Sequence, residues 1–358
     1  MKTLGWGILG CGFIGKKQIK GIRESKTGKV VAIASRSKEK LKGYAKETLL
    51  DEKEIEMYDN YEDLINDSKV DVVYIPIPVT KKYEWIEKAA KAKKHVCFEK
   101  PMISAEEVKA IIELADKHQI HIMDNTMWVH HERTYEIQKK YLNEKMQAKE
   151  SNDRIRRIHA EFNVALHFQG NPYDNIRYNP ELEPMGSLGD LGWYTIRGIL
   201  LGFNYELPEK VSAMTVKDKK TKAIIQVAAT LLYADGRMGT MTANFNEFTC
   251  RMHLTMHSKN RIITIPDFVI PIHEDNTIYL EQEKHKKATY SVFDSNGNET
   301  IKELPPSDQT AALVDDFVKD AQSESNERHH WREETLKTMQ VMDAIYASSE
   351  QDGKAVML

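Results

Sequence analysis

The sequence predicts an α/β protein of two domains, in which a doubly wound parallel sheet precedes an α+β domain built on a mostly antiparallel sheet. Three observations support this prediction. The 358 residues exceed what one hydrophobic core usually serves. Strand-like and helix-like segments alternate up to about residue 125. Beyond that residue the alternation ends, and several strand-like segments follow that are separated by residues typical of hairpin turns.

The first 125 residues read as repeated strand–helix units. Short apolar runs alternate with amphipathic segments, which is the pattern of parallel βαβ units. Ser104 and Glu107 form a capping box at the start of the last of these helices. The expected strands are 4–10, 29–35, 70–78, 95–101 and 120–125, and the expected helices are 13–25, 37–50, 61–68, 81–94 and 104–119.

The rest of the chain is expected to form the second domain, so we divide the protein into domains 1–125 and 126–358. From about residue 209 the chain reads as antiparallel strands, with hairpin turns at Asp235-Gly236 and Asn296-Gly297. Helices are expected at 131–145, 186–202, 308–322 and 331–349, and a long alternating strand at 154–168.

Composition excludes several classes of function. The formal net charge of -3 provides no global field for nucleic acid or an anionic membrane. No apolar run approaches the roughly 20 residues needed to span a bilayer. Cys11, Cys97 and Cys250 make no disulfide framework, so we expect reduced thiols and a cytoplasmic location.

A glycine-rich turn, Gly10-Cys11-Gly12-Phe13-Ile14-Gly15, ends the first strand and opens the first helix. This context distinguishes a dinucleotide-binding turn from an isolated GxGxxG match. Gly10 permits the tight turn, Gly12 lets the backbone approach a pyrophosphate, and Gly15 lets helix and strand pack closely. The helix N-terminus offers free N–H groups to the phosphates. The alternative is a glycine turn that is only structural.

The second strand ends in Ser35-Arg36-Ser37, where an NAD-binding fold usually has an acid for the ribose hydroxyls. An acid repels a 2′-phosphate, whereas a hydroxyl and a guanidinium bind one. We therefore predict NADP rather than NAD, with Lys40 adding charge. The alternative is that Arg36 and Lys40 are ordinary surface charges.

Two charged residues, Glu99 and Lys100, follow the fifth strand and precede Pro101. Ligands of doubly wound sheets bind outside the carboxyl ends of the strands, so Lys100 is expected to face the cofactor cleft. There a lysine hydrogen-bonds a substrate oxygen and supplies or relays its proton. An ordinary charged pair at a strand end is the alternative.

The segment Met185–Gly198 carries a second candidate group. In a helix, Asp190 and Tyr194 are four residues apart and share a face. We interpret Gly186, Gly189 and Gly192 as clearing side-chain bulk so that a ligand approaches this helix closely. A phenol donates a proton to a developing alkoxide when a neighbouring ammonium lowers its pKa. The alternative is a glycine-loosened core helix with an acid near its N-terminus.

Together with the glycine turn and Ser35-Arg36, the motifs "YIPIPVTKKYEW", "KKHVCFEKP", "TMWVHHERT" and "GSLGDLGWYTIRG" resemble the Gfo/Idh/MocA oxidoreductase family over essentially the whole chain. Within it, the sequence is most similar to the branch of dimeric dihydrodiol dehydrogenases and NADP-dependent xylose dehydrogenases. The resemblance implies a Rossmann domain followed by a domain with a large open sheet, often used for dimerisation.

The resemblance also implies site residues. The catalytic residues it implies are Lys100, Tyr194 and Asp190, with no metal. The expected cofactor-binding residues are Gly10, Gly12, Phe13, Ile14, Gly15, Ser35, Arg36, Lys40, Pro76, Pro78, Glu99, Lys100, Asn125 and Trp193. The sequence departs from the family where Thr-Pro-Asn and a later histidine are usual: here the run is Ile77 to Lys82. It departs again after Met127-Trp128, where Val129, His130 and His131 replace the family's MWxR pattern.

Other polar residues have weaker signals. The pairs His130-His131 and His329-His330 lack the spacing of zinc ligands. A polar loop precedes the expected helix 186–202, which contains Tyr194 and is called the tyrosine helix below. This loop is either ordinary protein surface or a loop that determines substrate specificity. The residues that would contact a substrate are His167, Asn171, Tyr173 and Asp174. Trp193 either flanks the nicotinamide or packs in the core.

The sequence therefore predicts an NADP-dependent oxidoreductase of sugars, cyclic diols or small carbonyls, with a small-molecule substrate, no nucleic-acid or membrane partner, and a homodimer or higher homo-oligomer. Tyr194 is the expected acid/base, with Lys100 lowering its pKa and holding the substrate oxygen, or the two roles are reversed. One alternative is a dinucleotide sensor without turnover. Another is a glycosidase with a tightly held NAD, which Ser35-Arg36 disfavours.

Overall fold

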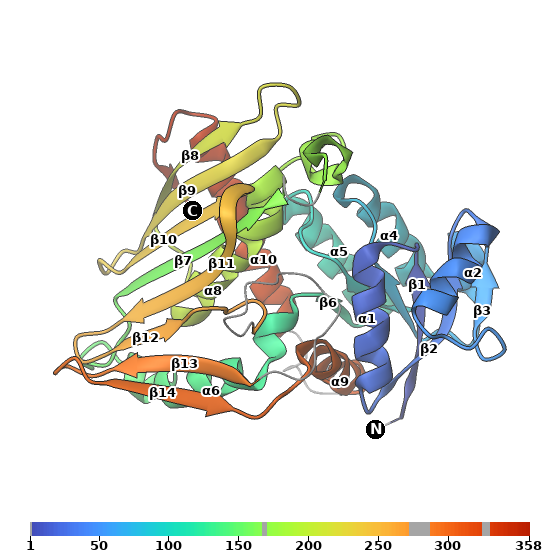
Figure 1. Cartoon of the computed structure of the whole chain (residues 1–358), viewed down its shortest axis with the longest axis horizontal. Coiled ribbons are helices and arrows are strands. Elements are labelled where there is room, and N and C mark those ends of the chain that lie inside the picture. Colours follow the sequence, from blue (N-terminus) through green and yellow to red (C-terminus); the bar gives the residue numbers. More distant parts are fainter. Residues whose placement is uncertain (1, 167–169, 272–286, 324–329) are drawn as a thin grey trace. The chain divides into compact units, whose positions relative to one another are not determined.

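A computed structural model describes residues 2–166, 170–271, 287–323 and 330–358 (Figure 1). The chain divides into two compact units. Unit 1 comprises residues 1–130 and 308–336, and unit 2 comprises residues 131–307 and 337–358. Both units combine helices with a sheet, so the predicted mixed α/β architecture is confirmed.

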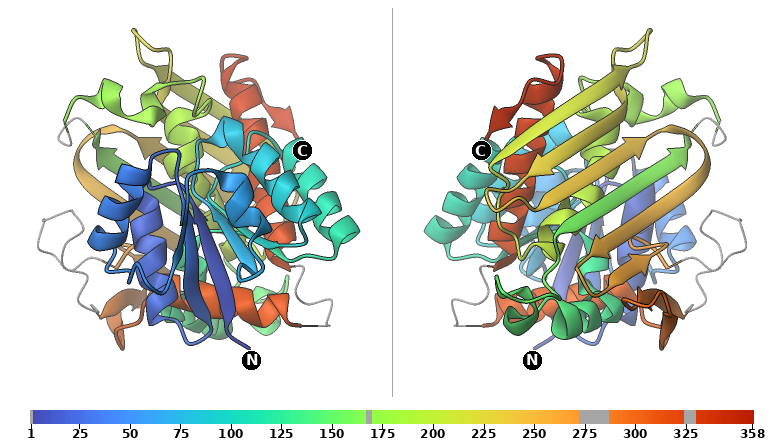
Figure 2. Two further views of the ribbon diagram at one scale, coloured as in Figure 1. Left: turned by 90° about the vertical axis from the view of Figure 1, so that its right-hand side faces the viewer. Right: turned by 90° about the vertical axis from the view of Figure 1, so that its left-hand side faces the viewer.

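Unit 1 is built on a six-stranded parallel sheet of order β3-β2-β1-β4-β5-β6. The left-hand view of Figure 2 shows blue helices and teal helices on opposite sides of these strands, as a doubly wound sheet requires. Its elements are β1 (Leu4–Leu9), α1 (Phe13–Glu24), β2 (Gly28–Ala34), α2 (Lys38–Glu47), β3 (Glu56–Tyr58), α3 (Tyr61–Asn66), β4 (Val72–Ile75), η1 (Val79–Lys81), α4 (Lys82–Lys91), β5 (His95–Phe98), α5 (Ala105–His118), β6 (Ile122–Asp124), η2 (Met127–His130) and α9 (Gln309–Ala321).

The central strands of this sheet are buried on both faces, which explains their near-continuous apolar sequences. Helix α5 begins at the predicted cap, where the Ser104 hydroxyl accepts a hydrogen bond from the Glu107 amide at 3.2 Å. The Glu107 carboxylate accepts from the Ile103 amide at 2.9 Å, one residue earlier than in a standard capping box. Local sequence therefore fixes where this helix starts.

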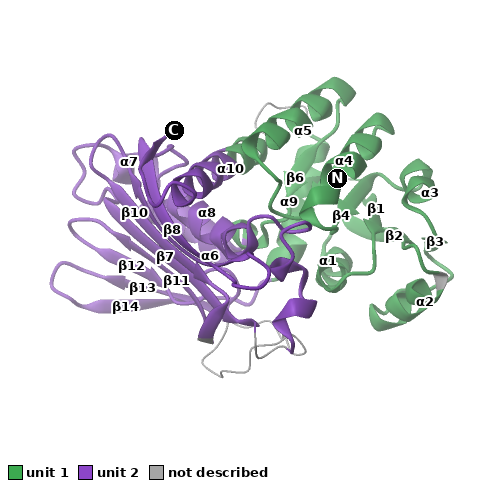
Figure 3. Cartoon of the chain, turned by 90° about the horizontal axis from the view of Figure 1, so that it is seen from above, with its two compact units in different colours: residues 1–130, 308–336 green, residues 131–307, 337–358 purple. Residues whose placement is uncertain are grey.

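Helix α9 belongs to unit 1, although the sequence-based division placed residues 308–336 in the second domain. Figure 3 shows α9 in the colour of unit 1. The Phe317 ring lies 5.1 Å from the Trp6 ring of β1, measured between centroids. The Thr27 hydroxyl donates to the Asp315 carboxylate at 2.6 Å. These contacts join residues that lie far apart in the sequence, 288 positions for Thr27 and Asp315, so no local pattern reveals them.

Unit 2 contains an open sheet in which nine strands are described, in the order β14-β13-β12-β11-β7-β10-β9-β8-β15. Strands β7 and β10 pair in parallel and the other pairs are antiparallel. The right-hand view of Figure 2 shows the green and yellow strands side by side. Its strands are β7 (Arg157–Ala165), β8 (Lys210–Lys217), β9 (Ile224–Leu232), β10 (Met238–Asn244), β11 (Asn246–His257), β12 (Ile262–Ile265), β13 (Ala288–Phe293), β14 (Glu299–Leu304) and β15 (Val356–Met357).

Both predicted hairpins are confirmed. Gly236 has φ +83° between β9 and β10, and Gly297 has φ +82° between β13 and β14. The helical elements of unit 2 are α6 (Glu132–Tyr141), α7 (Glu144–Gln147), η4 (Pro172–Asp174), η5 (Ile176–Tyr178), η6 (Leu188–Gly192) and α8 (Trp193–Gly202). Helix α10 (His330–Ser349) starts in unit 1 and ends in unit 2.

Two glycines of the predicted helix 186–202, Gly186 and Gly192, lie against strands of unit 2, and the interpretation that they make room for a ligand is wrong for these two. A Cβ on Gly186 would lie 2.2 Å from the Ile224 carbonyl oxygen of β9. One on Gly192 would lie 3.3 Å from the Met241 side chain of β10. Further along α8, a Cβ on Gly202 would lie 2.4 Å from Ile158 of β7. The glycines therefore let the helix approach the strands closely.

Candidate active site

The glycine turn has the tight backbone conformation that its sequence predicts. Gly10 has φ +94°, which L side chains rarely adopt. A Cβ on Gly15 would lie 2.4 Å from the Tyr44 hydroxyl of α2 and 3.7 Å from Ile8 of β1. The Tyr44 hydroxyl also donates to the Gly12 carbonyl at 3.0 Å. Gly15 thus makes room mainly for Tyr44 and only secondarily for the predicted packing of helix on strand.

Gly12 differs from the other two because described atoms leave the space beside it open. A Cβ there would meet nothing described closer than the Pro76 carbonyl oxygen at 3.9 Å. Gly12 is also the N-cap of α1, and no described side chain caps its N–H groups. Phe13 is 59% exposed, and Ile14 is partly exposed. An open cradle at an uncapped helix N-terminus fits the pyrophosphate of a dinucleotide.

Residues from the end of β2 lie beside this turn. The Ser35 side chain hydrogen-bonds the Cys11 thiol, and Lys40 lies near the same thiol; burial raises the pKa of Cys11, and these two neighbours oppose that effect. Arg36 is exposed and lies near Tyr61. Burial raises the pKa of the Tyr61 phenol, and the Arg36 charge opposes it. The structure therefore gathers the predicted hydroxyl and cations at the glycine turn.

Glu99 belongs to a partly buried hydrogen-bond network that the sequence did not reveal. Its carboxylate accepts hydrogen bonds from the Tyr74 hydroxyl and, at 2.6 Å, from the Asn125 side-chain amide. Asn125 also donates to the Tyr74 hydroxyl at 3.2 Å. Burial and the neighbouring Glu99 hold the pKa of Tyr74 well above its usual value, so Tyr74 stays a donor. Two predicted cofactor residues, Glu99 and Asn125, thereby fix the carboxyl end of β5, next to Lys100.

The turn after Lys100 is held by a lysine at the position where the sequence departs from its family. Lys82, the first residue of α4, is 1% exposed, and its ammonium donates to the Pro101 carbonyl at 2.8 Å. The Lys100–Pro101 bond is cis, and Lys100 itself is partly exposed. Pro76 and Pro78, both expected near the cofactor, follow β4 and are partly exposed. Lys82 thus positions the backbone beside the candidate catalytic lysine.

In unit 2, the predicted helix begins as a π-helical segment, η6, and becomes α-helical at Trp193. Asp190 lies in the π-helical segment and Tyr194 in α8, so the transition from π-helix to α-helix falls between these two residues. Tyr194 is 7% exposed, and its ring lies 5.5 Å from the Phe162 ring of β7. The Asp190 carboxylate forms an ion pair with Arg177, a partner that the sequence analysis missed. Short π segments often occur at functional sites.

Trp193 does not have the place predicted for it. Its side chain is fully buried, and the Arg197 guanidinium lies 5.3 Å from its ring centroid. A ring enclosed in this way presents no open face to a nicotinamide. We therefore correct the assignment: Trp193 is a core residue of α8.

The remaining polar candidates that the structure describes make local contacts. His130 pairs with Asp316 at 2.7 Å, and His131 accepts a hydrogen bond from the Arg133 amide at 2.9 Å. In the polar loop, Asn171 caps η4 by accepting from the Tyr173 amide at 3.4 Å. His167 and His329 lie outside the described residues. The described part of the chain contains no group of three or more potential metal ligands. It also contains no helix with the length and apolarity to cross a membrane.

A doubly wound sheet with an open glycine turn at the end of β1 defines a dinucleotide-binding domain, joined here to a domain with an open sheet. The sequence profile of the oxidoreductase family GFO_IDH_MocA, described as an NAD-binding Rossmann fold, matches residues 4–126. The profile of the GFO/IDH/MocA C-terminal domain matches residues 145–260. The chain therefore belongs to the Gfo/Idh/MocA oxidoreductase family and is an NAD(P)-dependent oxidoreductase.

Similar proteins cover nearly the whole chain. D-xylose 1-dehydrogenase (NADP(+)) 2 of Haloferax volcanii is 26% identical over 99% of this chain and 99% of its own. A dTDP-3,4-didehydro-2,6-dideoxy-alpha-D-glucose 3-reductase of Actinomadura kijaniata is 25% identical over 95% of this chain and 93% of its own. The solved structure of KijD10, a 3-ketoreductase from Actinomadura kijaniata, with NADP and TDP-benzene has a TM-score of 0.82 at 22% identity, over 97% and 98% of the two chains. That likeness confirms the fold.

Proposed function

We propose that this protein is an NADP-dependent oxidoreductase that transfers a hydride between the nicotinamide and a carbon of a sugar, cyclic diol or small carbonyl compound. The observation that carries the proposal is the open cradle at Gly12, with the hydroxyl of Ser35 and the cations of Arg36 and Lys40 beside the same turn. A hydroxyl and cations at this place bind a 2′-phosphate, which an acid would repel.

Named relatives support the substrate class. The similar proteins include an NADP(+)-dependent D-xylose 1-dehydrogenase and a deoxyglucose 3-reductase. Trans-1,2-dihydrobenzene-1,2-diol dehydrogenase of Xenopus tropicalis is 27% identical over 58% of this chain and 59% of its own. Sugars and cyclic diols share a secondary or anomeric hydroxyl carbon that becomes a carbonyl on oxidation. We propose a substrate with such a carbon.

We propose that three residues carry the proton chemistry. Tyr194 takes the hydroxyl proton during oxidation and returns it during reduction. Lys100 holds the substrate oxygen and lowers the pKa of the phenol through its charge, or the roles of Lys100 and Tyr194 are exchanged. Asp190 orients these groups. Bound NADP supplies or accepts the hydride at C4 of its nicotinamide.

Fluorescence titration with NADPH and NADH tests the cofactor assignment. We expect NADPH to bind at least tenfold more tightly than NADH. Arg36→Ala should lower this preference, because it removes a cation that binds the 2′-phosphate while Ser35 remains. Equal binding of both cofactors by the unchanged protein would refute the NADP assignment.

Turnover assays separate the enzyme from a dinucleotide sensor. Purified protein is screened with NADP(H) against aldoses, cyclic diols and dicarbonyls. Lys100→Met should reduce kcat by 10²–10⁴-fold, the usual contribution of a positioned acid or base. Tight NADPH binding without oxidation or reduction of any of these compounds favours the sensor. Full turnover by the Lys100→Met variant rules out the proposed mechanism.

We also propose a homodimer that associates through the open sheet. Large apolar side chains are exposed near one edge of this sheet: Met214 is 59% and Val216 51% exposed on β8, and Met357 is 61% exposed on β15. Exposed apolar groups of this kind often mark an interface. Analytical ultracentrifugation of the Met214→Glu, Val216→Glu double variant should show monomers where the unchanged protein shows dimers.

The cytoplasm is the location that we propose. Cys11, Cys97 and Cys250 are all free thiols in the structure, which suits a reducing compartment. Cell fractionation followed by detection of the native protein checks this assignment.

A further inference from the structure

Lys82 is a buried cation beside the segment that follows the candidate catalytic lysine. Strands β4 and β5 pair in parallel, with Ile75 opposite Phe98, so the segments that follow the two strands leave the sheet at the same edge. Lys82 is the first residue of α4, which follows β4, and it is 1% exposed. Its ammonium donates a hydrogen bond to the Pro101 carbonyl at 2.8 Å. This contact therefore joins the segment after β4 to the segment after β5.

The segment after β5 is anchored on each side of Lys100. On one side, the Glu99 carboxylate accepts a hydrogen bond from the Asn125 side-chain amide at 2.6 Å. On the other side, the Pro101 carbonyl accepts the hydrogen bond from Lys82. Pro101 is buried, whereas Lys100 is partly exposed. Lys100 is thus a partly exposed residue between two anchored neighbours.

The charge of Lys82 has a carboxylate near it in the same segment. The Glu107 carboxylate accepts a hydrogen bond from the Ile103 amide at 2.9 Å. Burial raises the pKa of Glu107, and the neighbouring Lys82 charge opposes that effect. A buried ammonium is costly unless it is hydrogen-bonded and paired, and a hydrogen bond from an ionised donor is stronger than one from a neutral donor. Lys82 therefore holds the Pro101 carbonyl more firmly than a neutral side chain would.

We propose that Lys82 is a positioning residue whose buried ammonium fixes the Pro101 carbonyl and thereby sets where Lys100 presents its own ammonium to the substrate. This inference rests on the function proposed above, in which Lys100 holds the substrate oxygen. Reacting atoms must lie about 3–3.5 Å apart and be aligned, so a small displacement of the group that holds the substrate slows the reaction. Lys82 acts through the backbone of Pro101, because its burial keeps it from contact with the substrate.

Three variants of Lys82 test this role. Lys82→Met and Lys82→Gln remove the ammonium, whereas Lys82→Arg keeps a cationic donor. Lys94→Met is the matched control within unit 1. Lys94 precedes β5, and its ammonium donates to the carbonyls of Asp67 at 2.8 Å and Val70 at 2.7 Å. The control thus removes a lysine–carbonyl contact at the end of β5 opposite to Lys100.

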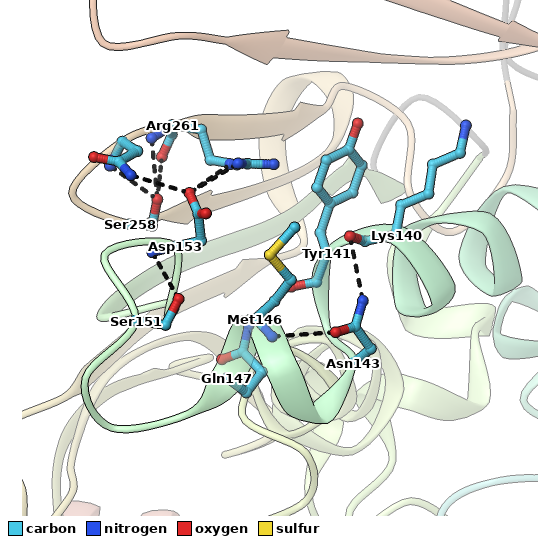
Figure 4. A network of polar contacts seen from close by, with 10 residues as sticks. Lys140, Tyr141, Asn143, Met146, Gln147, Ser151, Asp153, Ser258 and Arg261 are labelled. Carbon is cyan, nitrogen blue, oxygen red and sulfur yellow. Dashed lines mark hydrogen bonds and ion pairs between the residues drawn. The ribbon is translucent and has the colours of Figure 1, made fainter.

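Arg261→Gln is a second control, in unit 2. The Arg261 guanidinium donates to the Asp153 carboxylate at 2.8 and 3.1 Å (Figure 4). Neither partner belongs to unit 1 or to the tyrosine helix. This variant measures how far the loss of a cationic anchor lowers turnover through stability alone.

The first measurement is kcat at saturating NADP and saturating concentration of the compound that the turnover screen identifies. We expect Lys82→Met and Lys82→Gln to lower kcat by about 10–100-fold, because a misplacement of about 1 Å costs roughly 10²-fold. Lys82→Arg should retain more of the activity. Both controls should keep the kcat of the unchanged protein. Urea unfolding of every variant gives its stability. A Lys82→Met variant that loses no more kcat than Lys94→Met, at equal stability, would overturn the inference.

The second measurement needs no turnover. Protein labelled with ¹⁵N-lysine gives an NMR signal for the backbone amide of each lysine, and the Lys100→Met variant assigns the signal of Lys100. This signal should move or broaden in Lys82→Met, because the neighbouring carbonyl is released, and stay in place in Lys94→Met. An unmoved Lys100 signal overturns the inference even if the enzyme is inactive. A moved signal together with inactivity of the unchanged protein on every compound would instead contradict only the proposed function.

Discussion

At the scale of single residues, Gly10 and Gly12 are required for opposite reasons although they are two positions apart. Gly10 is needed by the fold, because φ +94° disfavours any side chain. Gly12 has φ -85°, which every residue adopts, and described atoms leave space for a Cβ. Only a ligand in that space requires Gly12 to be a glycine.

The two alanine variants should therefore behave differently. Gly10→Ala should lower the free energy of unfolding by about 1–3 kcal/mol, the usual cost of a side chain in such a conformation. Gly12→Ala should leave this free energy unchanged or raise it by about 0.4–1 kcal/mol. It should nevertheless weaken NADPH binding at least tenfold. Urea unfolding and fluorescence titration measure both effects, and a Gly12→Ala variant with unchanged NADPH affinity would show that no phosphate approaches there.

At the scale of elements, the β9–β10 hairpin depends on an ionised aspartate. Asp235 accepts hydrogen bonds from the Arg237 side chain at 2.9 and 3.0 Å and from the Arg154 side chain at 2.6 Å. Burial raises the pKa of Asp235, but the hydrogen bonds and charge of Arg237, together with the hydrogen bond from Arg154, outweigh burial and lower it to about 2 from an ordinary value of 3.8. Since the folded pKa is the lower one, the stabilisation is present above about pH 4 and is lost as the pH falls toward 2.

Asp235→Asn tests this dependence while keeping a residue that suits the turn. At pH 7 the variant should be less stable than the unchanged protein by about 1–2 kcal/mol, allowing for partial exposure of the carboxylate. The difference should shrink between pH 4 and pH 2. Urea unfolding followed by circular dichroism at several pH values measures it. A difference that is constant with pH would mean that the carboxylate charge does not stabilise the hairpin.

At the scale of the whole molecule, the dinucleotide-binding unit is completed by a helix from the far end of the chain. Phe317 of α9 is fully buried and contacts the rings of Trp6 and, at 4.8 Å between centroids, His121. Phe317→Ala should therefore destabilise unit 1 by about 3–5 kcal/mol, the usual cost of removing a buried phenyl ring.

A melting experiment with NADPH shows which of the two units the Phe317→Ala substitution destabilises. Because a ligand stabilises the unit that binds it, added NADPH should raise the melting temperature of the Phe317→Ala variant. Phe203→Ala is a matched control, since Phe203 is a buried phenylalanine at the end of α8 in unit 2. If the two variants have the same melting temperatures and NADPH raises both equally, the stability of unit 1 does not depend on α9 as proposed.

Much of the fold is predictable because its signals are local. The alternation of strands and helices, the cap at Ser104 and the glycines of both hairpins are read from neighbouring residues, and the structure has them at the expected places. The glycine turn and Ser35 are likewise local, since βαβ geometry brings the ends of adjacent strands together. The assignment of Trp193 to the cofactor-binding residues was wrong, because the burial of a side chain depends on distant residues and is not visible in the neighbouring sequence.

By itself, the sequence determined the class of fold, the dinucleotide turn and the absence of an acid after the second strand. Only the tertiary structure decided which unit α9 completes, that Lys82 holds the Pro101 carbonyl, and that Arg177 pairs with Asp190. The physical reason is separation along the chain. Backbone preferences, caps and periodicity act between neighbours, whereas ion pairs and core contacts join residues that become neighbours only after folding.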